Sequence, residues 1–167
     1  MKIAICYFSA TGRTAAMAEA IAGGIREAEP ACEVRCLPIG EVYKGNPANV
    51  SFVDGADGIL IGTPDYYAGE CWQIKQWLDT CPCHLAGKLA GAFATANFAV
   101  GGPVVALEHV LTHLMVQGCM VWSGGGAFGQ PFIHLGPVCL RGQEHEGAAL
   151  GRTYGRRFAA QLAKITG

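Results

Sequence analysis

Three hydroxyl side chains cluster in one hexapeptide near the start of the chain. Ser9, Thr11 and Thr14 surround Gly12, directly after the apolar run 3–8 and directly before a helical pattern. The first N–H groups of a helix have no acceptor within it, and the helix dipole favours an anion there. A helix cap needs only one hydroxyl, so the cluster predicts a site for a phosphate monoester. Its predicted contacts are Ser9, Ala10, Thr11, Gly12, Arg13 and Thr14.

Aromatic side chains follow two further apolar runs, 58–62 and 88–96. Tyr66, Tyr67 and Phe98 stand among small residues, and their rings suit stacking on a flat conjugated ligand. Each aromatic taken singly would more simply be a loop anchor packed on the sheet edge. Their joint placement beside a phosphate turn favours a ligand instead. The predicted contacts in these loops are Thr63, Pro64, Asp65, Tyr66, Tyr67, Ala68, Gly69, Thr95, Ala96, Asn97, Phe98, Gly101 and Gly102.

The elements that position these loops alternate along the chain. Strands are predicted over residues 3–8, 33–39, 58–62, 88–96 and 119–123. Helices are predicted over about 13–27, 70–80, 103–117 and 144–165. Little regular structure is expected over 40–57, and a long glycine-rich loop over 124–142. Strands separated by helices form a parallel, doubly wound sheet, which binds ligands beyond the carboxyl ends of its strands. All three candidate loops follow strands at that edge, within one predicted domain over residues 1–167.

The composition excludes several classes of protein. Hydrophobic residues make up 51% of the chain and charged residues 15%, and the net charge is −1. Neither nucleic acid nor an anionic membrane is therefore an expected partner. No apolar stretch is long enough to span a membrane, and no signal-peptide cleavage region follows the first apolar run. A cytoplasmic location is predicted.

The cysteines and histidines carry weaker signals. The eight cysteines lack zinc-type spacing, so no metal site is expected, and in the cytoplasm reduced thiols are the default. Cys81-Pro82-Cys83 is the one local pair; it is either redox-active or a loop at a helix end, and the second interpretation is the simpler one. His109 and His113 stand one helical turn apart and are expected on a solvated helix face.

The glycine-rich segment 124–129 matches the spacing of a dinucleotide-binding fingerprint. It does not open a helix, as such a site requires, so the sequence does not support a Rossmann site here. The long loop is expected instead to fold over the ligand pocket, with Phe128, Phe132 or His134 near the ligand's ring.

In these features the chain resembles the flavodoxin superfamily, whose Ser/Thr-x-Thr-Gly-x-Thr pattern matches residues 9–14. It is most similar to the WrbA-type NAD(P)H:quinone oxidoreductases and related FMN reductases, through Gly62-Thr63-Pro64 and the paired Gly101-Gly102 that opens a helix. The resemblance implies a flavodoxin-like three-layer α/β sandwich. In this fold a five-stranded parallel sheet, in the order 2-1-3-4-5, carries helices on both faces.

The resemblance also implies non-covalent FMN. The phosphate would lie on residues 9–14, and the isoalloxazine ring would lie between residues 63–69 and 95–102. Backbone groups near Ala68 and Gly69 would contact the redox-active nitrogen of that ring.

Two functions are compatible with this resemblance. A homo-oligomer is compatible with both of them. In the first, an enzyme, FMN accepts a hydride from NAD(P)H and passes electrons to a quinone or another small acceptor. The flavin carries that chemistry, so no side chain needs to act as a general acid. In the second, an electron carrier docks to redox protein partners. Carriers of this kind are strongly acidic, which steers them to basic partners, so the 13 acidic and 12 basic residues here favour the enzyme.

Overall fold

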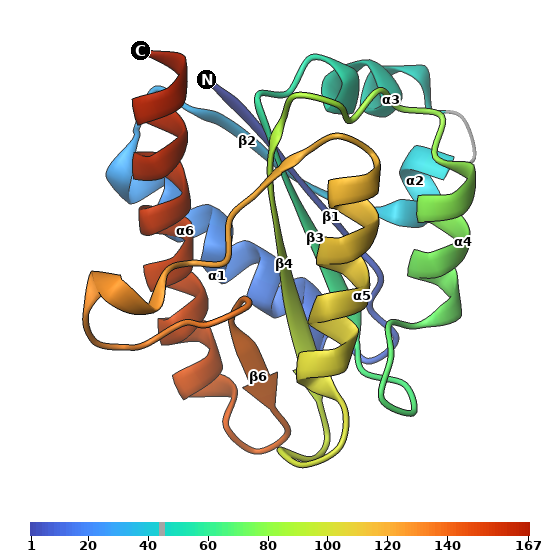
Figure 1. The fold of residues 1–167 in the computed structure, drawn as a ribbon, viewed down its shortest axis with the longest axis vertical. Helices are drawn as coiled ribbons and strands as arrows, with labels where there is room; N and C mark the ends of the chain where they lie inside the picture. The colour runs from blue at the N-terminus through green and yellow to red at the C-terminus, as the bar shows by residue number, and fades with distance from the viewer. Residues whose placement is uncertain (44–45) are drawn as a thin grey trace.

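A parallel β-sheet forms the centre of the structure, a computed structural model that describes residues 1–43 and 46–167 (Figure 1). Its strands lie in the order β2-β1-β3-β4-β5, and every pairing is parallel. This order confirms the predicted topology. The five strands are β1 (Lys2–Tyr7), β2 (Glu33–Pro38), β3 (Gly58–Pro64), β4 (Leu89–Ala96) and β5 (Met120–Val121).

The last position of the sheet is occupied by two short strands rather than one. β5 pairs with Leu89 and Ala90 at the start of β4, whereas β6 (Val138–Leu140) pairs with residues 94–96 at its end. The prediction of loop throughout 124–142 is therefore wrong at β6. Three residues between a proline and a glycine turn show no periodicity, and only the pairing with β4 fixes them as a strand.

Helices cover both faces of the sheet (Figure 1). One buried cluster joins the sheet to one pair of helices, and a second joins it to the remaining four. These two layers of helices complete the three-layer sandwich. The first pair is α1 (Arg13–Ala28) and α6 (Glu144–Thr166); the others are α2 (Ile39–Tyr43), α3 (Pro47–Asp54), α4 (Trp72–Thr80) and α5 (Pro103–Val116). None of the described helices is long and apolar enough to cross a membrane.

The segment 40–57 is more helical than predicted, since it contains most of α2 and all of α3. Pro47, which predicts a break, instead occupies the first turn of α3, where its missing N–H costs nothing. The Asn46 side chain caps that turn by accepting a hydrogen bond from the Ala48 N–H (3.1 Å). Lys44 and Gly45 of this predicted connection lie outside the described residues.

Helices α1 and α6 pack backbone against backbone. A Cβ atom on Gly24 would overlap the carbonyl oxygen of Arg152, and one on Gly155 would overlap that of Ile21. Glycine therefore permits an approach that no other residue would allow. Ion pairs of Glu27 with Arg152 and Arg156 close the exposed side of the same contact. The packing fixes the start of α1, and with it the turn that precedes this helix.

Candidate functional site

The three candidate loops meet at the carboxyl edge of the sheet, as the topology requires. Together they line a cleft of about 100 Å³ between the ends of β1, β3 and β4. The fold therefore brings together, as predicted, segments that are separated by more than eighty residues in the sequence. The cleft is lined by Ala10, Thr11, Arg13, Thr14, Pro64, Asp65, Tyr66, Thr95, Ala96 and Asn97.

The three hydroxyls of the first loop have different roles. The Ser9 hydroxyl accepts hydrogen bonds from the N–H groups of Gly12 (3.1 Å) and Ala15 (3.2 Å), so it caps α1. Thr14 is buried, and its Oγ1 lies 2.9 Å from that of Thr95 on β4. Thr11 is exposed at the tip of the loop. The turn that carries these three hydroxyls depends on Gly12, whose φ of 89° favours glycine.

Several backbone N–H groups of this loop remain available to a ligand. Within the described part of the chain, the N–H groups of Ala10, Thr11, Arg13 and Thr14 make no hydrogen bond. The first backbone bond of the helix runs from the Ala16 N–H to the Gly12 carbonyl, so the N–H groups before it have no backbone acceptor within the helix. A phosphate group is the ligand that such converging donors at a helix start bind best.

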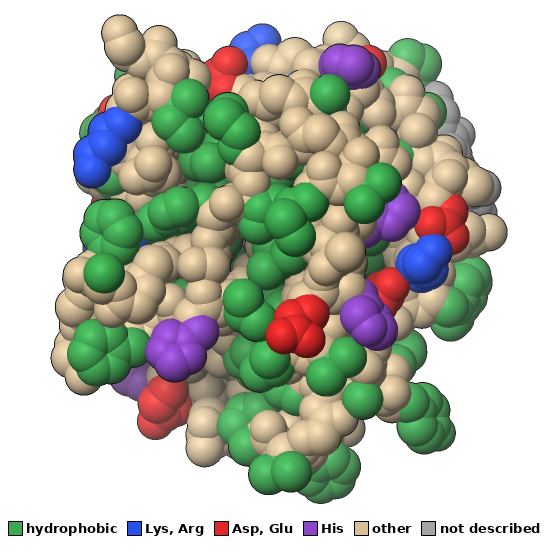
Figure 2. All heavy atoms as spheres, viewed as in Figure 1, with side chains coloured by type: hydrophobic (Ala, Val, Ile, Leu, Met, Phe, Trp, Pro, Cys, Tyr) green, Lys and Arg blue, Asp and Glu red, His purple; other side chains and the backbone are tan. Residues whose placement is uncertain are grey.

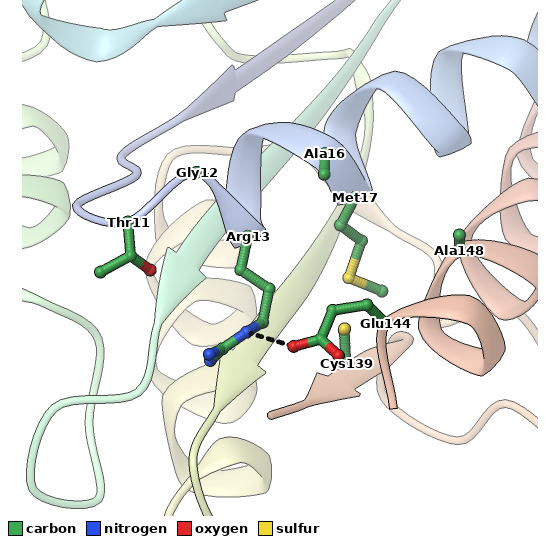
Figure 3. A pocket seen from close by; sticks show the side chains of 8 residues that line it. All are labelled: Thr11, Gly12, Arg13, Ala16, Met17, Cys139, Glu144 and Ala148. Carbon is green, nitrogen blue, oxygen red and sulfur yellow. Dashed lines mark hydrogen bonds and ion pairs between the residues drawn. The ribbon is translucent and has the colours of Figure 1, made fainter. Parts of the chain in front are cut away.

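The Arg13 side chain lies at the boundary between the cleft and a second cavity. Its Nε is 3.3 Å from a carboxylate oxygen of Glu144 (Figure 3). One terminal nitrogen is 3.4 Å from the Asn97 side-chain oxygen. The Gly142 N–H, together with the Arg13 guanidinium, holds the pKa of the Glu144 carboxyl below its ordinary value. The second cavity, of about 330 Å³, lies between the starts of α1 and α6 and includes Met17 in its lining. Arg13 thus places a positive charge beside the unpaired N–H groups.

The second loop is a tight turn organised by Asp65. The Asp65 N–H donates to the Thr95 carbonyl (2.7 Å), and its carboxylate accepts from the Ala68 N–H (3.1 Å). Tyr67 and Ala68 have φ values of 54° and 62°, a left-handed conformation that is costly outside glycine. Gly102 belongs to the same arrangement, because any Cβ there would overlap the Asp65 carboxylate. The second and third loops are therefore packed against each other through Asp65.

The aromatic side chains project into solvent instead of packing on the sheet edge. Tyr66 is 40% exposed, Phe98 77%, and the Tyr67 ring is wholly exposed. Figure 2 shows hydrophobic side chains gathered at the lower edge of the molecule, over the loop that follows β4. The loop-anchor interpretation is therefore wrong for these three residues. Exposed rings beside a polar cleft are instead typical of a surface that a ligand or partner covers.

Some predicted contacts lie outside the lining of the cleft. Thr63 is buried beneath the loop, where its Oγ1 accepts from the Cys71 N–H (3.0 Å) and donates to the Pro64 carbonyl (2.8 Å). Ser9 acts as the helix cap. The other residues absent from the lining are Gly12, Tyr67, Ala68, Gly69, Phe98, Gly101 and Gly102.

A wide groove beside the cleft was not predicted. It occupies about 830 Å³ between the turn 66–70, α4 and α5, and Tyr66 lines both the groove and the cleft. His109 lies at its margin, with Nδ1 2.8 Å from the Glu70 carboxylate, whose side chain is only 8% exposed. His113 contacts the Leu78 carbonyl (3.1 Å). The expectation of a solvated helix face is confirmed for His109, whose side chain is 54% exposed, but not for His113, which is 21% exposed. Both rings also tie α5 to the segment 70–78.

The long loop 122–137 does not cover the cleft. Arg157 of α6 donates hydrogen bonds of 3.0–3.2 Å to the carbonyls of four successive residues, 128–131. The Phe128 ring meets Trp122 edge-on, with centroids 5.9 Å apart. These contacts hold the loop against α6 (Figure 1), and neither it nor His134 lines the cleft. None of Phe128, Phe132 and His134 lines the cleft, so the cleft gives no support to the expectation that one of them lies near the ligand's ring.

A parallel sheet in this order, with a helix-opening hydroxyl loop after β1 and the other two loops at the same edge, defines a flavodoxin-like α/β fold. No protein-family model matches the sequence. The chain is 39% identical over 166 residues to a flavodoxin from Clostridium saccharobutylicum, covering 99% of both chains. The chain therefore belongs to the flavodoxin-like family.

Two further comparisons give similarities at lower sequence identity. It is 28% identical to an NAD(P)H dehydrogenase (quinone) from Geobacter sulfurreducens, over the full length of both chains. Its fold matches the solved structure of a WrbA-like flavodoxin from Agrobacterium tumefaciens with a TM-score of 0.79, at 23% identity and 98% coverage of each chain.

Proposed function

We propose that the chain binds FMN in the cleft between its three loops and uses it to transfer electrons from NAD(P)H to a quinone or another small acceptor. The observation that carries the proposal is the set of unpaired backbone N–H groups at Ala10, Thr11, Arg13 and Thr14, which lie beside a cleft that the Tyr66 ring lines. Bound FMN would supply hydride and electron transfer, and the protein would supply binding, orientation and electrostatics.

The phosphate of FMN would be held by the first loop. Its charge suits the unpaired N–H groups and the dipole of the sixteen-residue helix α1. Thr11 adds an exposed hydroxyl, and Arg13 adds a positive charge without leaving its contacts with Asn97 and Glu144. Ser9 keeps the loop in shape by capping the helix.

The isoalloxazine ring would lie between the second and third loops. Tyr66 already lines the cleft from one side and Asn97 from the other. Phe98 and Tyr67 are free to cover the ring, because neither is packed against the protein. The turn at Tyr67 and Ala68 would present its backbone to the redox-active nitrogen, which gives the left-handed conformation a function.

The reductase is favoured over a protein-docking carrier by two features. The chain has almost balanced charge, with 13 acidic and 12 basic residues, whereas docking to a basic partner is steered by excess charge. The groove of about 830 Å³ that adjoins the cleft at Tyr66 is also large enough for a small-molecule donor or acceptor. The carrier remains the second candidate, favoured by the 39% identity to a flavodoxin.

An anaerobic reduction experiment separates these functions. The protein is saturated with FMN, freed of excess flavin and mixed with NADPH or NADH, while the visible flavin band is followed. The proposal expects rapid bleaching, with electrons then passed to a quinone. A band that persists with both nucleotides but bleaches with dithionite would identify a carrier. Loss of all flavin during removal of the excess would contradict both functions.

A further inference from the structure

Cys81 and Cys83 form a contact pair that the proposed function does not use. They lie just beyond the end of α4, at the opposite end of this helix from the candidate cleft (Figure 1). The Cys83 N–H donates to the Cys81 sulfur at 3.4 Å, so the Cys81 side chain folds back over the next residues. The Cys81 sulfur also lies 3.9 Å from the Cys83 carbonyl oxygen. Both side chains are half-buried, so each is still partly reachable from solvent.

The backbone around the pair is held in place. Pro82 fixes the φ angle between the two cysteines. On the far side, the His84 N–H donates to the Asp54 carboxylate at 2.7 Å, which ties the turn to the end of α3. Because the turn is fixed with the Cys81 sulfur against the backbone of Cys83, closing a bond between the two sulfurs needs little further ordering of the chain.

Cys81 also differs chemically from the other cysteines. Hydrogen bonds from the Cys83 thiol and then from the Cys83 N–H lower the pKa of the Cys81 thiol, despite its partial burial. The same contact raises the pKa of Cys83. The remaining six thiols all have a raised pKa, chiefly because burial disfavours the thiolate. The thiolate is the nucleophile in disulfide exchange, so Cys81 is the attacking residue that the environment selects.

We propose that Cys81 and Cys83 are a second two-electron redox centre, a dithiol that low-molecular-weight disulfides oxidise reversibly to an intrachain disulfide. In the first step the Cys81 thiolate attacks one sulfur of the disulfide RSSR, whose S–S bond breaks and releases one thiolate, which takes up a proton. In the second step the Cys83 sulfur, losing its proton, attacks Cys81 in the mixed disulfide and releases the second RSH. The protein loses two hydrogen atoms and the disulfide gains them.

Trypsin isolates this pair from the other six cysteines. The peptide from Gln76 to Lys88 contains Cys81 and Cys83 and no other cysteine. The reduced full-length protein is incubated without oxygen in excess oxidised glutathione, quenched in acid, treated with N-ethylmaleimide and digested. The peptide is expected to be lighter than its dithiol form by two hydrogen atoms and free of maleimide, and dithiothreitol should restore the dithiol. A peptide that carries two maleimide groups after this incubation would overturn the proposal.

Single substitutions assign the two roles. Cys83→Ser should leave glutathione trapped on Cys81, because no resolving sulfur remains. Cys81→Ser should slow modification of the peptide by about tenfold or more, since Cys83 alone lacks a stabilised thiolate. Cys36→Ser, a change at another half-buried cysteine, is the matched control and should leave peptide oxidation unchanged. Equal rates in the Cys81 and Cys83 variants would contradict the assignment. The wild-type result does not depend on either variant folding, nor on whether the cleft binds FMN.

Discussion

Thr11 stands where the proposed phosphate would meet the loop. It is the most exposed of the three loop hydroxyls, and its own N–H and that of Ala10 are unpaired. Thr11→Asp would place a carboxylate among those donors, where it would occupy them and repel a phosphate. We expect the Kd for FMN to rise by at least about a hundredfold, because like charges in contact cost several kcal/mol. A flavin fluorescence titration measures this, with Thr11→Ser as the control that keeps the hydroxyl. Equal affinity in the wild type and the Asp variant would exclude this phosphate site.

Phe98 tests the ring contact independently of the phosphate. Its side chain is 77% exposed, so replacing it should cost little stability in the free protein. Phe98→Ala should weaken FMN binding by about tenfold, since an aromatic pair contributes about 0.5–1.5 kcal/mol beyond its buried area. The same titration measures the effect, and the unfolding temperature of the free protein serves as the control. A variant that binds FMN as tightly as the wild type would show that the ring does not lie against the third loop.

At the residue scale the sequence predicted the position of the first loop better than the role of each of its side chains. The spacing of the three hydroxyls locates the loop, but Ser9 turns inward as a cap and Thr14 pairs with Thr95. Both roles depend on how α1 and β4 are placed in the fold, and the spacing of residues within the hexapeptide carries no information about that placement. The pairing of His109 with Glu70 was missed for the same reason, because its partners lie on segments 39 residues apart.

At the scale of elements, the contact of α1 with α6 determines how the first loop is presented. Gly155→Ala would normally favour a helix, but here the new methyl group would overlap the Ile21 carbonyl. We expect the free energy of unfolding to fall by about 1–3 kcal/mol, as overpacked cores do, measured by urea denaturation. Gly40→Ala is the matched control, because this glycine of α2 has no atom within 4 Å of the added group. Equal losses in the two variants would contradict close backbone packing.

Elements with a long periodic pattern were predictable, and short ones were not. Helices α1, α5 and α6 begin at the predicted residues, since each has a buried face and a glycine or proline at its boundary. β6 has only three residues, too few to show a periodic pattern. α2 and α3 lie on either side of the segment before Pro47, and a proline is compatible both with the start of a helix and with a break in regular structure. The position of the loop 122–137 was not predictable from its own glycines, because hydrogen bonds from Arg157 on α6 hold it.

Across the whole molecule, the two proposed redox sites lie at opposite ends of α4. The cleft lies at the carboxyl edge of the sheet, where strand order reverses between β1 and β3, and α4 begins beside it. The cysteine pair lies beyond the last residue of the same helix. The near-zero net charge gives no long-range steering toward a charged protein. Recognition of a donor or acceptor would therefore depend on the cleft, the adjoining groove and the exposed rings around them.

The most direct test of the central claim compares FMN with riboflavin, which has the same ring but no phosphate. Isothermal titration of the wild-type protein with each ligand gives the two Kd values under one set of conditions. If the unpaired N–H groups of residues 10, 11, 13 and 14 hold the phosphate, FMN should bind at least about a hundredfold more tightly, because hydrogen bonds to a charged group contribute about 1.5–3 kcal/mol each. Equal affinities, or no binding of FMN, would contradict the account.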